Sequence, residues 1–237
     1  MKPKKKVRSD SENVPMQTRR IETKKKAAKK TDVREVVIAA PNFQYVEFKI
    51  RGTAPLVMHK FSTKARLAMM EKMSTKKTPG KKKVREIRDY DEEMREASNF
   101  IDKKKGIYGI PAMAFVNSMV SACRITGAVM TRAKLSLFVI ADAYVDGTGL
   151  VKITKGKPRR DERAARLPNN SFDIRIRPMW DAGWESVVKI RYDGDQFGLS
   201  DITALMMRAG MQVGILEGRP GSKNSAGLGW GTFEIVE

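Results

Sequence analysis

The chain has 237 residues, 41% of them hydrophobic and 31% charged, and its formal net charge is +20. This composition fits a soluble globular chain with basic additions, and the charge predicts a polyanionic partner, nucleic acid before an anionic membrane surface. No apolar run approaches the ~20 residues of a membrane span, and no apolar segment follows the basic amino terminus. We therefore expect no membrane partner and a cytoplasmic location.

The first thirty residues contain twelve Lys and Arg residues and three acidic residues, with hardly any apolar side chain. Such a segment cannot bury enough apolar surface to fold, so we expect residues 1–31 to form a disordered basic arm. Residues 32–237 are then a single domain, with insertions at about 74–105 and 152–192. The remainder of the chain is also strongly basic, so charge is not confined to the arm.

Residues 43–51 alternate as a half-buried strand, with Phe43, Tyr45, Phe48 and Ile50 assigned to the core after a shift in phase. Ser62 is a candidate cap for a helix that places Leu67, Met70 and Met73 on one face. Residues 76–85 predict a mobile basic loop. Residues 88–101 predict a second, mostly solvated helix.

The best-defined helix follows Pro111 and stops at Gly127. Its apolar stripe predicts a core contribution from Met113, Val116, Met119, Val120 and Cys123. Residues 135–145 are apolar on both faces, which predicts a central strand. The turn at 146–149 leads into a short partner strand at 150–153.

A basic segment between Lys152 and Arg166 lacks the apolar side chains needed to bury itself, so we expect it to project. Residues 172–177 alternate cleanly and place Arg175 and Arg177 on one strand face. Residues 186–192 fit an antiparallel return strand. The pattern predicts a basic β-hairpin, either as a binding element or as a solvated flap.

The end of the chain predicts a helix capped by Ser200 and stopped by Gly210, followed by a strand, a glycine-rich loop and a strand. The strands are expected at 211–217 and 230–236, and the loop at 218–229. Glycine permits close backbone approach, and the loop also carries Arg219, Lys223 and Asn224. This combination suits a phosphate chain, although an elaborate hairpin turn is the alternative.

Without its insertions the chain reads strand, helix, strand, strand, helix, strand, which is an α+β, ferredoxin-like (RRM-like) βαββαβ sheet with helices on one side. This order, the basic hairpin and GILEGRPGSKNSAGLGWG at 214–231 together resemble the RAMP superfamily of CRISPR systems, or a phage-type relative. The resemblance implies a palm that holds single-stranded RNA or DNA. The hairpin corresponds to a thumb, and subunits repeat along the strand as a homo-oligomer or filament.

The sequence lacks the combinations of residues that most enzymatic reactions require. His59 is the single histidine and Cys123 the single cysteine, so we expect no metal site, no cofactor and no cysteine–histidine pair. Asp142 and Asp146 are best explained by a turn. Because some RAMP relatives cleave RNA with a histidine, a ribonuclease that uses His59 is the alternative; a structural or virion protein with a charge-neutralising arm is another.

We therefore predict a non-catalytic single-strand binder. Tyr108, Phe172 and Trp230 are candidate stacking surfaces. The predicted binding residues are cationic or aromatic side chains of the hairpin, the terminal loop and the strand end near His59: Lys155, Lys157, Arg159, Arg160, Arg163, Arg166, Arg175, Arg177, Arg219, Lys223, Trp230, His59 and Lys60.

Overall fold

The structure is a computed structural model that describes residues 39–61, 63–74, 88–166, 172–222 and 227–236. The chain divides into two units, Met1–Ala39 and Ala40–Glu237, and the second contains every helix and strand described below. The predicted basic arm, the Ser62 cap, the 76–85 loop, Lys223 and Asn224 lie outside the described residues.

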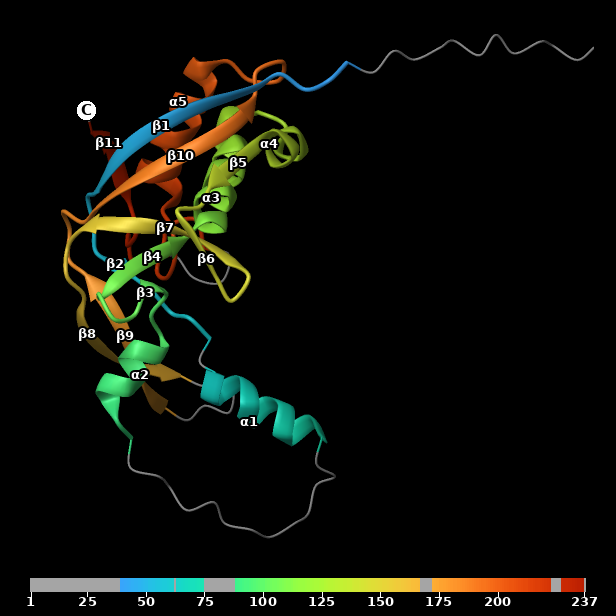
Figure 1. The fold of residues 1–237 in the computed structure, drawn as a ribbon. Coiled ribbons are helices and arrows are strands. Elements are labelled where there is room, and N and C mark those ends of the chain that lie inside the picture. Colours follow the sequence, from blue (N-terminus) through green and yellow to red (C-terminus); the bar gives the residue numbers. More distant parts are fainter. Residues whose placement is uncertain (1–38, 62, 75–87, 167–171, 223–226, 237) are drawn as a thin grey trace, which may run out of the picture. The chain divides into compact units, whose positions relative to one another are not determined.

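The described residues form a mixed α+β fold with five α-helices and antiparallel strand pairing (Figure 1). The helices are α1 (Thr63–Ser74), α2 (Tyr90–Glu96), α3 (Ala112–Thr126), α4 (Met130–Ser136) and α5 (Leu199–Arg208), which continues as the π-helical turn η1 (Ala209–Val213). The strands are β1 (Phe43–Gly52), β2 (Leu56–Val57), β3 (Phe100–Asp102), β4 (Ile107–Pro111), β5 (Leu137–Ile140), β6 (Ala143–Val145), β7 (Thr148–Lys155), β8 (Arg159–Arg166), β9 (Phe172–Trp180), β10 (Glu185–Asp193) and β11 (Phe233–Val236).

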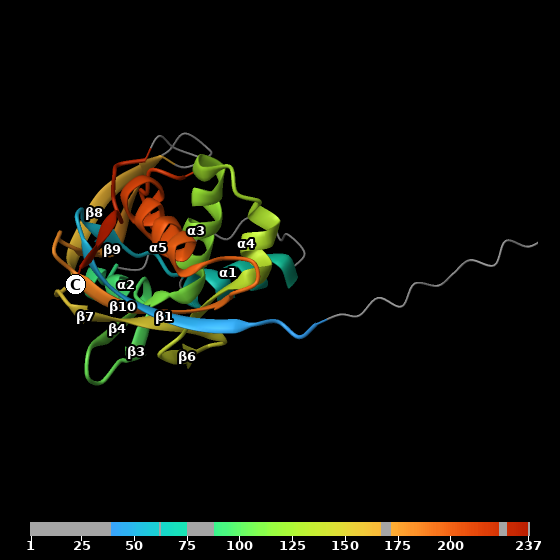
Figure 2. The same cartoon turned by 90° about the horizontal axis from the view of Figure 1, so that it is seen from above.

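The main sheet has the order β11-β1-β10-β7-β4-β3. One end of β10 pairs with β7, and its other end pairs with β5 from Tyr192↔Leu137 to Lys189↔Ile140. A smaller sheet has the order β2-β9-β8. The helices α3 and α5 lie together on one side of β1 and β10, as Figure 2 shows.

The core lies between that side of the main sheet and the helices α3 and α5. Phe48 and Ile50 of β1 and Val188 and Ile190 of β10 point into it. The central part of α3 faces the same core through Phe115. The hydroxyl of Ser118 donates to the carbonyl oxygens of Ala209 (3.1 Å) and Gly214 (2.9 Å). This side chain therefore ties α3 to the end of η1.

The predicted strand at 43–51 is confirmed as β1, but only one of its two faces is buried. Phe48 and Ile50 belong to the core, whereas Phe43 and Tyr45 are exposed on the opposite face. The predicted helix α3 is confirmed with its left-handed Gly127 cap (φ 75°). Of its predicted core stripe, Met113 is exposed, because the buried arc of the helix is centred on Phe115 and Met119.

The region predicted as helix 88–101 contains the shorter helix α2 and the strand β3. Asp89 caps α2 by accepting hydrogen bonds from the backbone N–H groups of Asp91 and Glu92. The prediction of a single central strand at 135–145 is wrong. These residues form the end of α4 and two short strands, β5 and β6, which pair with different neighbours. The helix α1 is confirmed, but Leu67, Met70 and Met73 are exposed.

Two predictions at the carboxyl end are wrong. Gly210 does not stop α5, and residues 211–217 do not form a strand, because the helix continues through η1 to Val213. Gly214, at φ 70°, ends it. A Cβ at Gly210 would lie 2.2 Å from the carbonyl oxygen of Phe233, so this glycine permits close packing of η1 on β11. The predicted last strand is shorter, and begins at Phe233.

Candidate nucleic-acid interface

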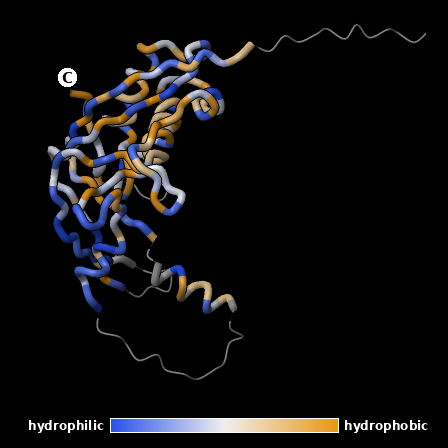
Figure 3. Tube along the Cα trace, in the orientation of Figure 1, coloured by the Kyte–Doolittle hydropathy of each residue, from blue (hydrophilic) through white to orange (hydrophobic). Residues whose placement is uncertain are grey.

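The basic hairpin exists, but its two strands are β8 and β9. They pair from Arg159↔Met179 to Arg166↔Phe172, and the residues between the strands, 167–171, lie outside the described residues. The predicted return strand at 186–192 is wrong, because β10 pairs with β1 across the main sheet. The trace is predominantly hydrophilic along β8 (Figure 3), which has no run of apolar side chains to mark it as a strand.

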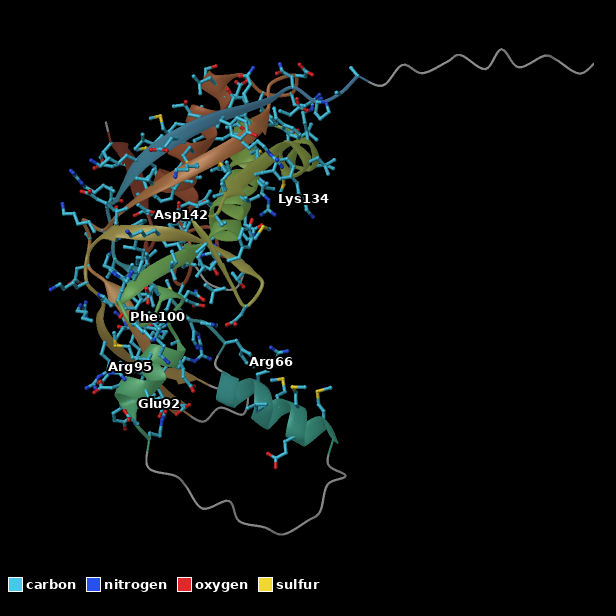
Figure 4. All side chains as sticks on the ribbon, in the orientation of Figure 1. Arg66, Glu92, Arg95, Phe100, Lys134 and Asp142 are labelled. Carbon is cyan, nitrogen blue, oxygen red and sulfur yellow. The ribbon has the colours of Figure 1, made fainter. Side chains whose placement is uncertain are left out.

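One face of the hairpin is covered by α2, which Glu92 and Arg95 mark in Figure 4. A guanidinium nitrogen of Arg160 lies 3.1 Å from the carboxylate of Asp91. Arg88 donates to the carbonyl oxygen of Ile174 at 2.8 Å. Arg160 is therefore held against α2 rather than on the hairpin face that carries Arg175 and Arg177.

The other face of the hairpin carries a cluster of charged residues, which includes Asp161, Arg163, Arg175 and Arg177. The register places Asp161 opposite Arg177 and Arg163 opposite Arg175, so their side chains leave the same face. Arg177 is only 8% exposed and donates to Asp161 at 2.8 Å. Arg163 donates to the same carboxylate at 3.0 Å. The carboxylate of Asp161 thus neutralises part of the positive charge on this face of the hairpin.

Arg175 differs from its neighbours. It is exposed, and no carboxylate among the described side chains pairs with it. Lys157, at the base of the hairpin, is exposed and lacks such a partner too. Arg219 donates to the carbonyl oxygen of Leu216 at 2.8 Å, an interaction that leaves its charge uncompensated. These three cations are the predicted site residues whose charge is available to a ligand.

The remaining predicted cations are paired or not described. Lys155 lies 3.1 Å from Glu185, Arg159 lies 2.9 Å from Asp181, and Lys60 lies 3.2 Å from Asp146. The side chain of Arg166 is not among those that the structure describes, and Lys223 lies outside the described residues.

Trp230 packs under the hairpin with Val57 and Met179 and is 8% exposed. The guanidinium of Arg163 lies 4.3 Å from the centre of its ring, and that of Arg177 lies 5.9 Å away. Because Trp230 is almost completely buried and these cation–π contacts take up part of its ring, little of the ring is open to a base.

The other two aromatic residues predicted as stacking surfaces offer no free ring in the described structure. Tyr108 is packed between Phe100, at 4.6 Å between ring centres, and Trp180, at 5.2 Å. The side chain of Phe172 is not described. The exposed aromatic side chains that the structure does describe, among them Tyr45 and Tyr144, lie elsewhere.

The glycine-rich loop is folded on itself. The N–H groups of Gly214, Gly221 and Gly231 donate to the carbonyl oxygens of Ala209, Val213 and Pro55, so these amides are not available to a phosphate. Gly231 has φ 65°, and a Cβ there would lie 1.9 Å from the carbonyl oxygen of Ile215. These glycines are required for the close packing of the loop.

His59 follows β2 and lies within electrostatic reach of both the hairpin and the terminal loop. Partial burial lowers its pKa below the ordinary value of 6.5, and the charges of Arg175 and Arg177 lower it further. Glu217 acts in the opposite direction. The imidazole is consequently neutral at pH 7, with two arginines and one carboxylate around it.

Asp142 and Asp146 are used structurally. Asp142, labelled in Figure 4, accepts from the N–H of Lys152 at 2.8 Å. Asp146 and Gly147, both at positive φ (49° and 74°), form the predicted turn between β6 and β7. Among the described residues, no group of three or more His, Cys, Asp or Glu side chains is arranged to hold a metal ion.

The sequence-based interpretation missed the open face of the main sheet, opposite α3 and α5. Tyr45 of β1, Arg191 of β10 and Phe138 of β5 lie side by side there across three strands. A sequence signal for this surface was present in β1, because aromatic residues occur on both faces of the strand and only one face can pack against the helices.

The chain matches no known protein-family model and no curated protein. None of the helices in the described residues combines the length and apolar character that crossing a membrane requires. The assignment of function therefore depends on the site itself.

Proposed function

We propose that this protein is a non-catalytic binder of single-stranded RNA or DNA, and that its subunits repeat along the strand. The observation that carries the proposal is that Lys157 and Arg175 are exposed and Arg219 is half-buried, and that no described carboxylate pairs with any of these three cations. Phosphates are the ligands that such a group attracts in a chain with a net charge of +20.

The paired cations support the same proposal. Ion pairs between exposed side chains, such as Arg159 with Asp181, contribute at most about 1 kcal/mol. A phosphate chain competes with such carboxylates at low cost. Arg177 is different, because it and Asp161 are both buried, and we assign it a structural role in the hairpin.

We further propose that the core is ferredoxin-like and of the RAMP kind. The strands β11, β1, β10 and β5 are neighbours in that order and pair antiparallel. With α3 after β1 and α5 after β10, this is the 4-1-3-2 order of a βαββαβ sheet. Under this proposal the hairpin β8–β9 corresponds to a thumb and the loop before β11 to the glycine-rich loop.

The test is fluorescence anisotropy of the full chain with a labelled 20-nucleotide dT strand, the matching rU strand and a duplex of the same length, from 50 to 200 mM salt. The proposal expects tighter binding of at least one single strand than of the duplex, with affinity that falls as salt rises. Equal or tighter binding of the duplex would contradict it.

A metal-independent ribonuclease is the second candidate, and the charges around His59 favour it. A neutral imidazole beside two arginines and Glu217 has the composition of a general acid–base site next to a phosphate. Incubation of the protein with labelled RNA in the presence of EDTA tests whether the protein is such a ribonuclease. Cleavage that His59→Ala abolishes would replace the binding proposal, and intact RNA would exclude this candidate.

A charge-neutralising arm is the third candidate, and it concerns residues 1–31. Removal of the arm separates it from the first proposal. The binding proposal expects residues 32–237 to retain single-strand binding with a smaller salt slope, whereas complete loss of binding would assign the nucleic acid to the arm.

A further inference from the structure

The open face of the main sheet carries a compact group of aromatic and cationic side chains. The register places Tyr45, Arg191 and Phe138 in one row across β1, β10 and β5. The next row holds Glu47, Lys189 and Ile140. We call these two rows, together with Phe43, the open-face platform.

Arg191 organises the aromatic rings of the platform. Its guanidinium carbon lies 4.6 Å from the ring centre of Phe43 and 4.8 Å from that of Phe138. The two rings meet edge to face at 5.9 Å. The Nε of Arg191 has no hydrogen-bond partner in the described structure. The rings are thus fixed in place by a cation rather than by burial in the core.

The platform remains exposed although it contains large apolar groups. Tyr45 is 67% exposed, and Phe43, Phe138 and Ile140 are all exposed as well. A shallow hollow of about 260 Å³ lies among Tyr45, Ile140 and Lys189. Contiguous exposed apolar groups with charged neighbours are typical of an interaction surface.

We propose that the open-face platform stacks the unpaired bases of the single strand, with Tyr45 and Phe138 as the stacking rings. This proposal rests on the proposed function and names where the bases lie, whereas the hairpin cations contact the phosphates. Tyr45 is the most accessible ring of the platform, and Arg191, its cross-strand neighbour, places positive charge beside it. Base stacking on exposed aromatic rings tolerates any sequence, because every base has a π-face.

Charge distinguishes nucleic acid from a second copy of this chain as the occupant. Each copy of the chain carries a net charge of +20, so two copies repel each other, whereas a polyanion is attracted to this surface. Glu47 is the single carboxylate in the two rows, and the carboxylate of Asp142 lies 3.7 Å from Lys189 at their edge, so Arg191 is the platform cation with which no described carboxylate pairs. A polyanion with flat rings complements both the charge and the aromatic surface.

The test compares two labelled strands of equal length and charge, one of dT and one of abasic residues, by anisotropy with the full chain. We expect the wild type to bind dT more tightly. Tyr45→Ala and Phe138→Ala should each weaken dT binding by about tenfold, the loss expected for one stacked base, and leave abasic binding and the salt slope unchanged. Tyr144→Ala is the matched control, because Tyr144 is also exposed but belongs to β6, outside both rows.

Each outcome separates the platform from the proposed function. If the wild type binds both strands equally, or if both platform variants bind dT as the wild type does, the platform is overturned while phosphate binding through the hairpin stands. If the wild type binds neither strand, both proposals fail. Thermal melting confirms that the variants are folded, and light scattering reports self-association. A change in oligomeric state without a change in dT affinity would overturn the platform in favour of a contact between copies.

Discussion

Arg175→Gln and Arg177→Gln separate binding from stability on one face of one strand. Both variants remove one positive charge from β9, and the two residues differ in burial and pairing. Arg175 is exposed and no described carboxylate pairs with it, so its loss should leave the free energy of unfolding within about 0.5 kcal/mol of wild type. Arg177 is buried against Asp161, which keeps Arg163 as a second partner, so the loss of Arg177 removes one buried charged hydrogen bond and should cost roughly 1.5–3 kcal/mol.

The binding data should show the reverse contrast. One lost phosphate contact reduces the salt slope of single-strand binding by about 0.7. When the salt concentration rises from 50 to 200 mM, the affinity of Arg175→Gln should therefore fall by a factor roughly 2.6 times smaller than the factor by which the wild-type affinity falls. Arg177→Gln, measured where it is folded, should keep the wild-type slope. The assays are anisotropy against salt and urea unfolding followed by fluorescence. A wild-type slope for Arg175→Gln, or a large loss of stability, would refute the assignment of Arg175 as an available cation.

Three further predictions concern the loop, the histidine and the arm. Gly231→Ala should destabilise the fold by about 3 kcal/mol in urea unfolding, because the added Cβ meets the carbonyl oxygen of Ile215. Gly229→Ala should cost about 1–2 kcal/mol, because Gly229 has φ 73° but open space around it. Equal losses of stability in the two variants would contradict the packing argument. A phosphate near His59 raises the lowered pKa of the imidazole, so binding takes up a proton and affinity should rise as pH falls from 7.5 to 5.5; His59→Gln should abolish this rise, and its persistence would exclude His59 as the group that titrates. Removal of residues 1–31 should reduce the salt slope in anisotropy and preserve binding to dT.

Local signals in the sequence predicted the elements that depend on local chemistry. Proline and glycine bracket α3, and Asp146 with Gly147 makes the predicted turn, because each of these residues has a backbone preference that few environments override. The alternation in β1 predicted a strand with one buried face. It left the orientation ambiguous, since Tyr45 and Phe48 are both aromatic and only the position of the helices decides between them.

Strand pairing could not be predicted from the same signals. The pattern of β9 fits any antiparallel neighbour, and β10 alternates more regularly than β8, so the sequence pattern predicts β10 as the partner of β9. In the structure β10 is required between β1 and the strands β5 and β7, where Val188 and Ile190 are buried. The hydrophilic β8 is a strand because it pairs with β9, which is a tertiary effect rather than a propensity.

The candidate site shows the same division between local and tertiary information. The sequence identified the cationic segment but not which of its cations are compensated, because Asp161 and Asp181 reach their arginines only through the hairpin register and the turn that follows it. The open-face platform depends on three strands that are far apart in the chain. Arg191 carried no sequence signal at all, and its role between two phenylalanine rings appears only once β10 lies between β1 and β5.

The folded loop changes how the glycines of the carboxyl end contribute to binding. Because the amides of Gly214, Gly221 and Gly231 are used internally, the loop contributes through the groups that it positions, above all Glu217 near His59 and Trp230 under Arg163. The N–H of Glu217 donates to Val57 and that of Gly231 to Pro55, which fixes the loop against the segment that leads to His59. A glycine substitution here should therefore alter affinity only to the extent that it unfolds the loop, so that losses of affinity and of stability rise together across a series. Substitution of Arg175 should break that correlation, because it would remove a proposed phosphate contact without disturbing the loop.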